Sequence, residues 1–191
     1  AFMVDGKLYT GWADGTFKVQ DYDGTTYGPQ TNVPLALIDG NSASLNRFST
    51  EDLPTITGMF YDEATGRLYF TKSGSTALHH RSFSPQSRIV GGLRTSSAAN
   101  AGGVDWSTVQ TMFLAGGKLY TSSSIGNLVA RDWNAATGLP TGSATTVSGP
   151  AIDGEDWYAR DAFVYAQAGV EVPNTPPTAS FSSSCTDGSC Q

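Results

Sequence analysis

A short phrase recurs along this 191-residue chain, and it constrains the fold more than any other feature. Each copy contains a short apolar run, and the first three copies continue through a turn with Gly to a Leu-Tyr pair. The apolar runs are Phe2–Val4, Met59–Tyr61, Met112–Leu114 and Phe163–Tyr165. The small residues that open them, Ala1, Gly58, Thr111 and Ala162, are spaced by 57, 53 and 51 positions. Repeats of this length predict a propeller or a solenoid.

The pattern inside each unit predicts four antiparallel strands. The first strand is apolar at every position, which is typical of a strand buried on both faces. Tight hairpin turns follow at Asp5-Gly6, Thr65-Gly66 and Gly116-Gly117, where positive φ angles are needed. The second strands alternate around Leu8-Tyr9, Leu68-Tyr69 and Leu119-Tyr120, and the third strands end on Tyr22, Phe83 and Trp133. With weaker outer strands around Val33, Ile89-Val90 and Thr145–Val147, each unit describes a propeller blade.

We therefore predict an all-β fold of β-propeller blades over residues 1–168. Three four-stranded units span about 1–57, 58–110 and 111–161, and a fourth inner strand spans 162–167. Propellers usually close with four to eight blades. We expect the chain to be part of a larger propeller, and closure on itself or on copies of itself is the alternative. Residues 34–51 are a polar connection that we expect on the surface.

The composition of the chain limits the kinds of molecule that it is expected to bind. The net charge is −6 with a pI of about 4.7 and no basic cluster, which argues against nucleic acid and anionic membranes. No apolar run approaches the roughly 18 residues of a membrane span, so we expect no membrane insertion.

Residues 169–177 are rich in Pro and predict a stiff linker. Cys185 and Cys190 predict a local disulfide rather than a metal clip, and hence an extracellular setting.

Three stretches resemble propeller-like regions of secreted bacterial multidomain proteins: Thr57–Tyr69, Gln110–Tyr120 and Val147–Arg160. The tail Asn174–Cys190, with its Pro-Pro, its Ala-Ser-Phe and its paired Cys, resembles the entry to a PKD domain, an immunoglobulin-like β-sandwich. The second resemblance implies that residues 178–191 begin such a sandwich. Together they imply a modular, secreted or cell-surface protein with a role in adhesion or carbohydrate binding.

Catalytic motifs are scarce, and we predict no catalytic residue, no metal centre and no enzyme activity. His79 and His80 are adjacent on a strand, so their side chains point to opposite faces and cannot share one metal. Asp52, Asp105 and Asp156 recur with the repeat, which favours a structural role. The alternative is a glycan-active enzyme that uses paired carboxylates.

Calcium is the one cofactor with candidate residues. Asp153–Asp156 and Asp21–Gly24 are compact acidic turns that offer hard oxygen ligands. Neither continues into a twelve-residue loop with a terminal Glu, and Asp-Gly is common hairpin chemistry in any case. We therefore expect no bound cofactor.

Aromatic residues are the better functional candidates. Propeller geometry places the loop entering each first strand and the hairpin after each second strand on one face of the disc. The candidate ligand-binding residues on that face are Trp12, Trp106, Trp157, Tyr158 and Arg160. Exposed Trp and Tyr rings offer flat apolar surfaces to sugars. The alternative is that Trp106 and Trp157 are wedged between blades.

The sequence thus predicts a non-catalytic extracellular recognition or scaffold module. Its expected partners are a polysaccharide or cell-surface glycan and other domains of the same polypeptide. The alternatives are the glycan-active enzyme and a structural subunit that self-associates through open propeller edges.

Overall fold

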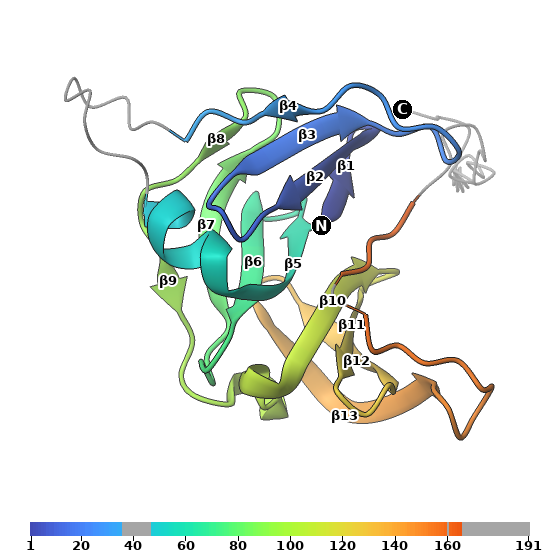
Figure 1. Ribbon diagram of the computed structural model, residues 1–191. Helices are drawn as coiled ribbons and strands as arrows, with labels where there is room; N and C mark the ends of the chain where they lie inside the picture. Colours follow the sequence, from blue (N-terminus) through green and yellow to red (C-terminus); the bar gives the residue numbers. More distant parts are fainter. Residues whose placement is uncertain (36–46, 160, 166–191) are drawn as a thin grey trace, which may run out of the picture.

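The computed structural model describes residues 1–35, 47–159 and 161–165, and within these ranges the chain forms three antiparallel sheets of the propeller-blade type (Figure 1). Blade A contains β1 (Phe2–Val4), β2 (Lys7–Gly11), β3 (Phe17–Asp21) and β4 (Thr31–Asn32). Blade C contains β10 (Val109–Ala115), β11 (Lys118–Ser123), β12 (Leu128–Asn134) and β13 (Leu139–Ser148). In both blades the strands pair in chain order, so the predicted all-β blade architecture is confirmed.

Blade B has a divided outer strand. Its first three strands are β5 (Ile56–Asp62), β6 (Arg67–Lys72) and β7 (His79–Ser84). The end of β7 pairs with β8 (Ile89–Val90), whereas its beginning pairs with β9 (Thr95–Ser96). The interruption between β8 and β9 places a loop beside the middle of β7, and this loop takes part in the ion cluster described below.

Positive φ angles close the inner hairpins of blades A and C as the sequence predicts. In blade B the tight turn expected at Thr65-Gly66 is wrong: the last strand pair is Asp62 with Arg67, residues 63–66 form the loop, and within it only Gly66 has a positive φ, of 64°. Asp5 and Gly6 have φ angles of 51° and 70°, and Gly116 and Gly117 have 55° and 73°. These turns join β1 to β2 and β10 to β11 with successive residues in register up to the turn. Two-residue turns of this kind match the twist of the strands that they connect.

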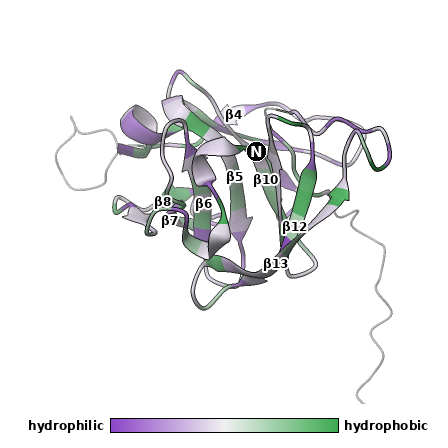
Figure 2. Cartoon of the chain, turned by 90° about the horizontal axis from the view of Figure 1, so that it is seen from below, coloured by the Kyte–Doolittle hydropathy of each residue, from purple (hydrophilic) through white to green (hydrophobic). Residues whose placement is uncertain are grey.

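The hydrophobic core lies between the blades. One buried cluster joins blades A and B through residues such as Phe2, Tyr9 and Phe83. A second cluster joins blades B and C and includes Phe60, Tyr69 and Trp106. The polar colouring is heaviest in the loops and the helical turn near residue 50, while β12 carries a hydrophobic stretch (Figure 2). Each sheet therefore buries its apolar face against the next sheet.

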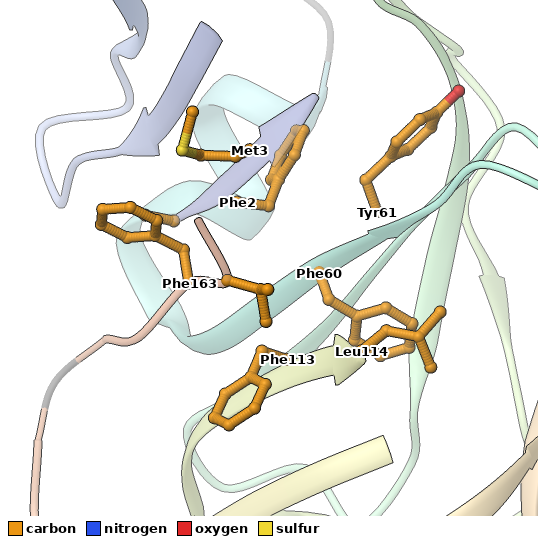
Figure 3. Close-up of a pocket in the computed structure, with 9 residues that line it drawn as sticks. Phe2, Met3, Phe60, Tyr61, Phe113, Leu114 and Phe163 are labelled. Carbon is orange, nitrogen blue, oxygen red and sulfur yellow. The ribbon is translucent and has the colours of Figure 1, made fainter. Parts of the chain in front are cut away.

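Four inner segments surround one axis. The small hollow between them has a volume of about 40 Å³ and is lined by Ala1, Phe2, Met3, Phe60, Tyr61, Phe113, Leu114, Phe163 and Val164. Figure 3 shows these side chains converging from the inner segments. Residues 161–165 occupy the fourth position without strand pairing in the described part of the chain. Residues 166 and 167 of the expected closing strand lie outside the described residues.

The strand register corrects the alignment of the repeat. Phe2 pairs with Tyr9, Phe60 with Tyr69 and Phe113 with Tyr120. The three phenylalanines are therefore equivalent, at spacings of 58 (60 − 2) and 53 (113 − 60). Alignment on Gly58 and Thr111 is wrong by one residue, because small side chains are a weaker marker than the paired aromatic rings.

Short helical turns enter the inner strands. A π-helical turn, η1 (Phe48–Asp52), and a 3-10 turn, η2 (Leu53–Thr55), precede β5, while the 3-10 turns η3 (Ala101–Gly103) and η4 (Trp106–Thr108) precede β10. Phe48 is fully buried between blades A and B, where its ring lies against Phe17 and Phe70, and Asp52 is also fully buried. At the end of the 34–51 connection, Arg47, Thr50 and Glu51 are exposed as expected, but the Phe48 ring turns inward and fills the space between blades. Residues 36–46, the 169–177 linker, the 178–191 sandwich start and the cysteines lie outside the described residues.

Candidate functional site

Trp106 does not present a binding surface. Its side chain is 0% exposed, and its Nε1 donates to the carbonyl oxygen of Ala101 at 3.0 Å. It packs in the cluster between blades B and C with Phe60 and Met112. Trp106 is therefore removed from the ligand-binding candidates, because its ring fills the space between two blades.

Trp12 and Tyr158 are exposed, and Trp157 is half-buried. Lys18 Nζ lies 4.9 Å from the centre of the Trp12 ring and covers one of its faces. Trp157 Nε1 donates to Ser148 Oγ at 2.5 Å, and the ring lies 6.4 Å from that of Phe113. The ring of Tyr158 has no hydrogen-bond or ring partner among the described residues. Arg160, the fifth candidate, lies outside them.

These aromatic residues do not form one site. Trp12 follows β2, in the hairpin that touches η1 through a 2.7 Å hydrogen bond from Ser49 Oγ to the Gly15 carbonyl. Trp157 and Tyr158 lie beyond β13, where the Trp157 amide donates to the Gly126 carbonyl at 3.0 Å. The two regions are well apart in Figure 1. A single sugar-binding surface made of all these rings is therefore not what the fold provides.

The three repeated aspartates have different environments. Asp105 Oδ1 accepts from the Ser107 amide at 3.1 Å and caps η4, and Asp156 Oδ1 accepts from the Tyr158 amide at 2.9 Å. Both are exposed, whereas Asp52 is 0% exposed. No hydrogen bond joins any two of them in the described ranges. Asp52 is withdrawn from solvent, and Asp105 and Asp156 each accept a hydrogen bond from a backbone amide of their own turn, which is a structural role.

Asp52 is the centre of a buried ion cluster. Its Oδ2 accepts from Arg81 Nε at 2.9 Å, and its Oδ1 accepts from Lys72 Nζ at 2.9 Å and from Arg94. Arg81 also donates to the carbonyl oxygens of Gly91 and Gly92, at 3.1 and 2.5 Å, in the loop between β8 and β9. The cluster connects η1 to three parts of blade B, which is a structural arrangement.

His79 lies beside that ion cluster. Its Nε2 and Nδ1 lie 2.9 Å from Ser75 Oγ and 2.8 Å from Ser96 Oγ. Burial, with the positive charges of Arg94 and Lys72, lowers the pKa of His79 to about 4 against an opposing effect of Asp52. The imidazole is neutral at physiological pH and links β7 to β9, so the structural interpretation holds for His79.

His80 points to the other face of β7, into a groove between blades B and C. The groove, here called the B–C groove, has a volume of about 240 Å³. It is lined by Tyr69, Leu78, His80, Thr95, Ser96, Ser97, Ala98, Ala101, Thr137, Gly138 and Leu139. The buried lining residues Tyr69 and Leu78 provide apolar surface, and the exposed residues Thr95, Ser96 and Thr137 provide hydroxyl groups. No side chain that lines it bears a formal charge when His80 is neutral.

The repeat pattern of the sequence does not predict this groove. His80 pairs with Tyr69 across β6 and β7, and the two rings lie 5.1 Å apart. Burial and, less strongly, the charge of Arg67 lower the pKa of His80. The equivalent partners of Tyr9 and Tyr120 are Val19 and Ala130. A histidine at a position that is otherwise apolar was the signal available in the sequence.

The acidic and histidine side chains of the described ranges form no metal-binding cluster, because no three His, Cys, Asp or Glu side chains there converge in a way that could hold a metal ion. In the acidic turns, Asp153 Oδ1 accepts from the Gly149 amide at 3.0 Å and Asp23 Oδ1 from the Thr26 amide at 2.7 Å. None of the helical segments described is long and apolar enough to cross a bilayer.

Comparison with known proteins gives similarity of fold only. No protein-family model matches the sequence, and no curated protein matches it significantly. Among solved structures, the hemopexin fold protein CP4 from cow pea has a TM-score of 0.50 at 15% identity, covering 81% of this chain and 66% of that one. A 2S albumin seed protein from Dolichos has a TM-score of 0.47 at 12% identity, covering 75% and 65%.

A propeller is also among the similar structures. The WD40 beta propeller domain of Doa1 has a TM-score of 0.32 at 13% identity, covering 67% of this chain and 34% of that one. The chain thus spans about two thirds or less of the length of these three structures. The likeness to CP4 agrees with the blade architecture and carries no information on ligands.

Proposed function

We propose that this chain is a non-catalytic recognition module that binds an uncharged glycan in the B–C groove. The observation that carries the proposal is the lining of the groove, which combines apolar side chains with hydroxyl groups and a neutral imidazole. Sugars present apolar C–H faces and hydroxyl groups, and sites of mixed character suit them. A charged ligand would find no side chain of opposite charge in the lining.

The size of the groove limits the ligand. Its volume of about 240 Å³ is below the roughly 300–1,000 Å³ of pockets that hold drug-sized molecules. It therefore suits a single sugar ring or the end of a chain. His80 contributes one donor and one acceptor when neutral. Protonation at acidic pH would place a charge beside Leu78 and Tyr69, so binding should weaken as the pH falls through the lowered pKa of His80.

An extracellular setting is part of the proposal. It is supported by the resemblance to secreted propeller-like regions and by the expected pairing of Cys185 with Cys190. In such a setting the module would attach a larger protein to a polysaccharide or to a cell-surface glycan.

Filling the groove tests the proposal. Ala98 lines the groove and is exposed, so Ala98→Trp should occupy the space without disturbing the core. We expect it to lower glycan affinity at least about tenfold, which corresponds to roughly 1.4 kcal/mol. Ala99→Trp is the matched control, because Ala99 is exposed and does not line the groove.

A glycan array with the full chain, followed by titration calorimetry on any hit, provides the measurement. Failure to bind any neutral glycan would reject the function. Binding that is kept in Ala98→Trp but lost in Trp12→Ala would reject the groove as the site and place the ligand on the exposed aromatic surface instead.

A further inference from the structure

Blades A and B share an aromatic arrangement. In each, a Phe of the inner strand stacks on a Tyr of the second strand: Phe2 on Tyr9 with ring centres 5.1 Å apart, and Phe60 on Tyr69, also at 5.1 Å. The interplanar angles are 7° and 12°. All four rings are almost fully buried.

A third ring from the next blade covers each stacked pair edge-on. Phe83 of blade B meets Phe2 and Tyr9 at 5.7 and 5.2 Å, both at 80°. Trp133 of blade C meets Phe60 and Tyr69 at 5.1 and 5.0 Å, at 88° and 83°. Edge-to-face contacts of this geometry add to the energy of burial. The contact between neighbouring blades therefore consists of a stacked pair and an edge ring.

Blade C repeats the stacked pair but lacks the edge ring. Phe113 stacks on Tyr120 at 4.9 Å and 11°, in the same register as the other two pairs. Both rings are half-buried, and the only further aromatic contact in the described part of the chain is Trp157, tilted by 41° at 6.4 Å from Phe113. The pair faces away from blade B, toward the fourth position around the axis.

The residue beside each pair selects the type of edge ring. Trp133 Nε1 donates to Asp62 Oδ2 at 3.1 Å, and Asp62 lies two residues beyond Phe60. The equivalent residue in blade A is Val4, and there the edge ring is a phenylalanine. In blade C it is Ala115, which offers no carboxylate to an indole N–H. The open pair of blade C therefore suits a phenyl or phenol ring.

Tyr158 is the free ring of that type. The exposed aromatic side chains among the described residues are Trp12, Tyr27 and Tyr158. Trp12 is covered by Lys18, and Tyr27 stacks on Tyr22 at 4.5 Å. Tyr158 is 62% exposed and directly follows Trp157, which contacts the open pair. The segment that reaches the stacked pair of blade C through Trp157 thus also carries an exposed ring that can act as an edge ring.

We propose that two copies of this chain associate through this surface about a two-fold axis, with Tyr158 of each copy packed edge-on against Phe113 and Tyr120 of the other. A two-fold interface must be self-complementary, and this surface contains both parts of the contact already made between blades. Exposed Ile125, Val147 and Ile152 lie on the segments around Trp157 and extend the apolar area. The association is independent of the glycan proposal, because none of these residues lines the B–C groove.

Sedimentation equilibrium of the full chain over a wide concentration range tests the proposal. The average mass should rise from 20.1 kDa toward twice that value. Tyr158→Glu should weaken association at least about tenfold, as expected for a central aromatic contact. Tyr158→Phe should preserve it, because the ring rather than the hydroxyl makes the contact. Tyr27→Glu is the control on the other exposed tyrosine and should also preserve it.

Mixing two variants tests the reciprocal geometry. Tyr158→Glu and Tyr120→Ala each lose both contacts in a homodimer, but a mixed dimer of the two retains one intact contact. The mixture should therefore associate more tightly than either variant alone, which a misfolded protein would not do. A mass of 20.1 kDa at every concentration, or unchanged association of Tyr158→Glu, would overturn the proposal.

Discussion

Replacing Asp52 with asparagine tests whether one repeated aspartate holds η1 against blade B. The carboxylate is 0% exposed and accepts charged hydrogen bonds from Arg81, Lys72 and Arg94. Arg81 is 1% exposed, so it cannot turn to solvent when its partner is lost, whereas Lys72 and Arg94 are 16% and 31% exposed. The variant leaves one deeply buried guanidinium without its counter-charge. Removing one partner of such a pair costs about 3–5 kcal/mol.

The matched control is Asp105→Asn. Asp105 is at the equivalent position of the repeat, but it is exposed and only caps η4. Because asparagine is also a good N-cap, this change should alter stability by less than about 0.5 kcal/mol. Urea unfolding of the two variants gives the comparison. At roughly 2–4 °C per kcal/mol for a chain of this size, Asp52→Asn should also lower Tm by about 6–20 °C.

Acid stability gives a second measurement on the same variant. Burial acts to raise the pKa of Asp52, but the hydrogen bonds from Lys72, Arg94 and Arg81 outweigh it, and the pKa is lowered from its usual 3.8. The stabilisation is therefore complete above the unfolded-state pKa and is lost as the pH falls through the lower folded-state value. Asp52→Asn should remove this dependence. Equal losses of stability in Asp52→Asn and Asp105→Asn would refute the reasoning.

Two further predictions concern the contact between blades B and C. Trp133→Phe should cost about 1–3 kcal/mol in urea unfolding, because buried Asp62 loses the indole donor at 3.1 Å; a neutral result would mean that another donor replaces it. Gly138→Ala should lower stability by at least about 1 kcal/mol, because φ is 68° and a Cβ there would collide with the Tyr69 hydroxyl. The same variant should weaken glycan binding, since both residues line the B–C groove; full stability and full binding would contradict the geometry.

The blade architecture was readable from the sequence because its signals are local. A continuously apolar run, a two-residue turn such as Asp5-Gly6 and an alternating Leu-Tyr strand each specify one piece of a hairpin. Phe83 and Trp133, which make the edge contacts, occupy equivalent places in the repeat, in the third strands. The repeat does not predict the divided outer strand of blade B, because the division depends on where the chain leaves β8.

The candidate site was harder to predict, because the exposure of a side chain depends on how neighbouring blades pack together and not on the strands of one blade alone. Trp106 and Trp157 occupy similar places in the sequence, before an inner strand. Trp106 is buried because blade B covers it, whereas Trp157 is half-exposed at the fourth position around the axis. The B–C groove likewise combines β6, β7 and β9 with the turn before β13, and these segments are brought together only by the docking of two blades.

Asp52 shows how a repeated residue acquires a separate role. Its equivalents at Asp105 and Asp156 accept hydrogen bonds from the backbone close by in sequence, as a short acidic side chain at the start of a turn does. Asp52 instead faces Arg81, a charged residue that lies between His79 and Phe83 on the buried face of β7. A buried guanidinium requires a carboxylate, and the divided outer strand provides the carbonyl oxygens of Gly91 and Gly92 for its remaining donors. The irregular outer strand and the buried aspartate are therefore two consequences of one arginine in the third strand of blade B.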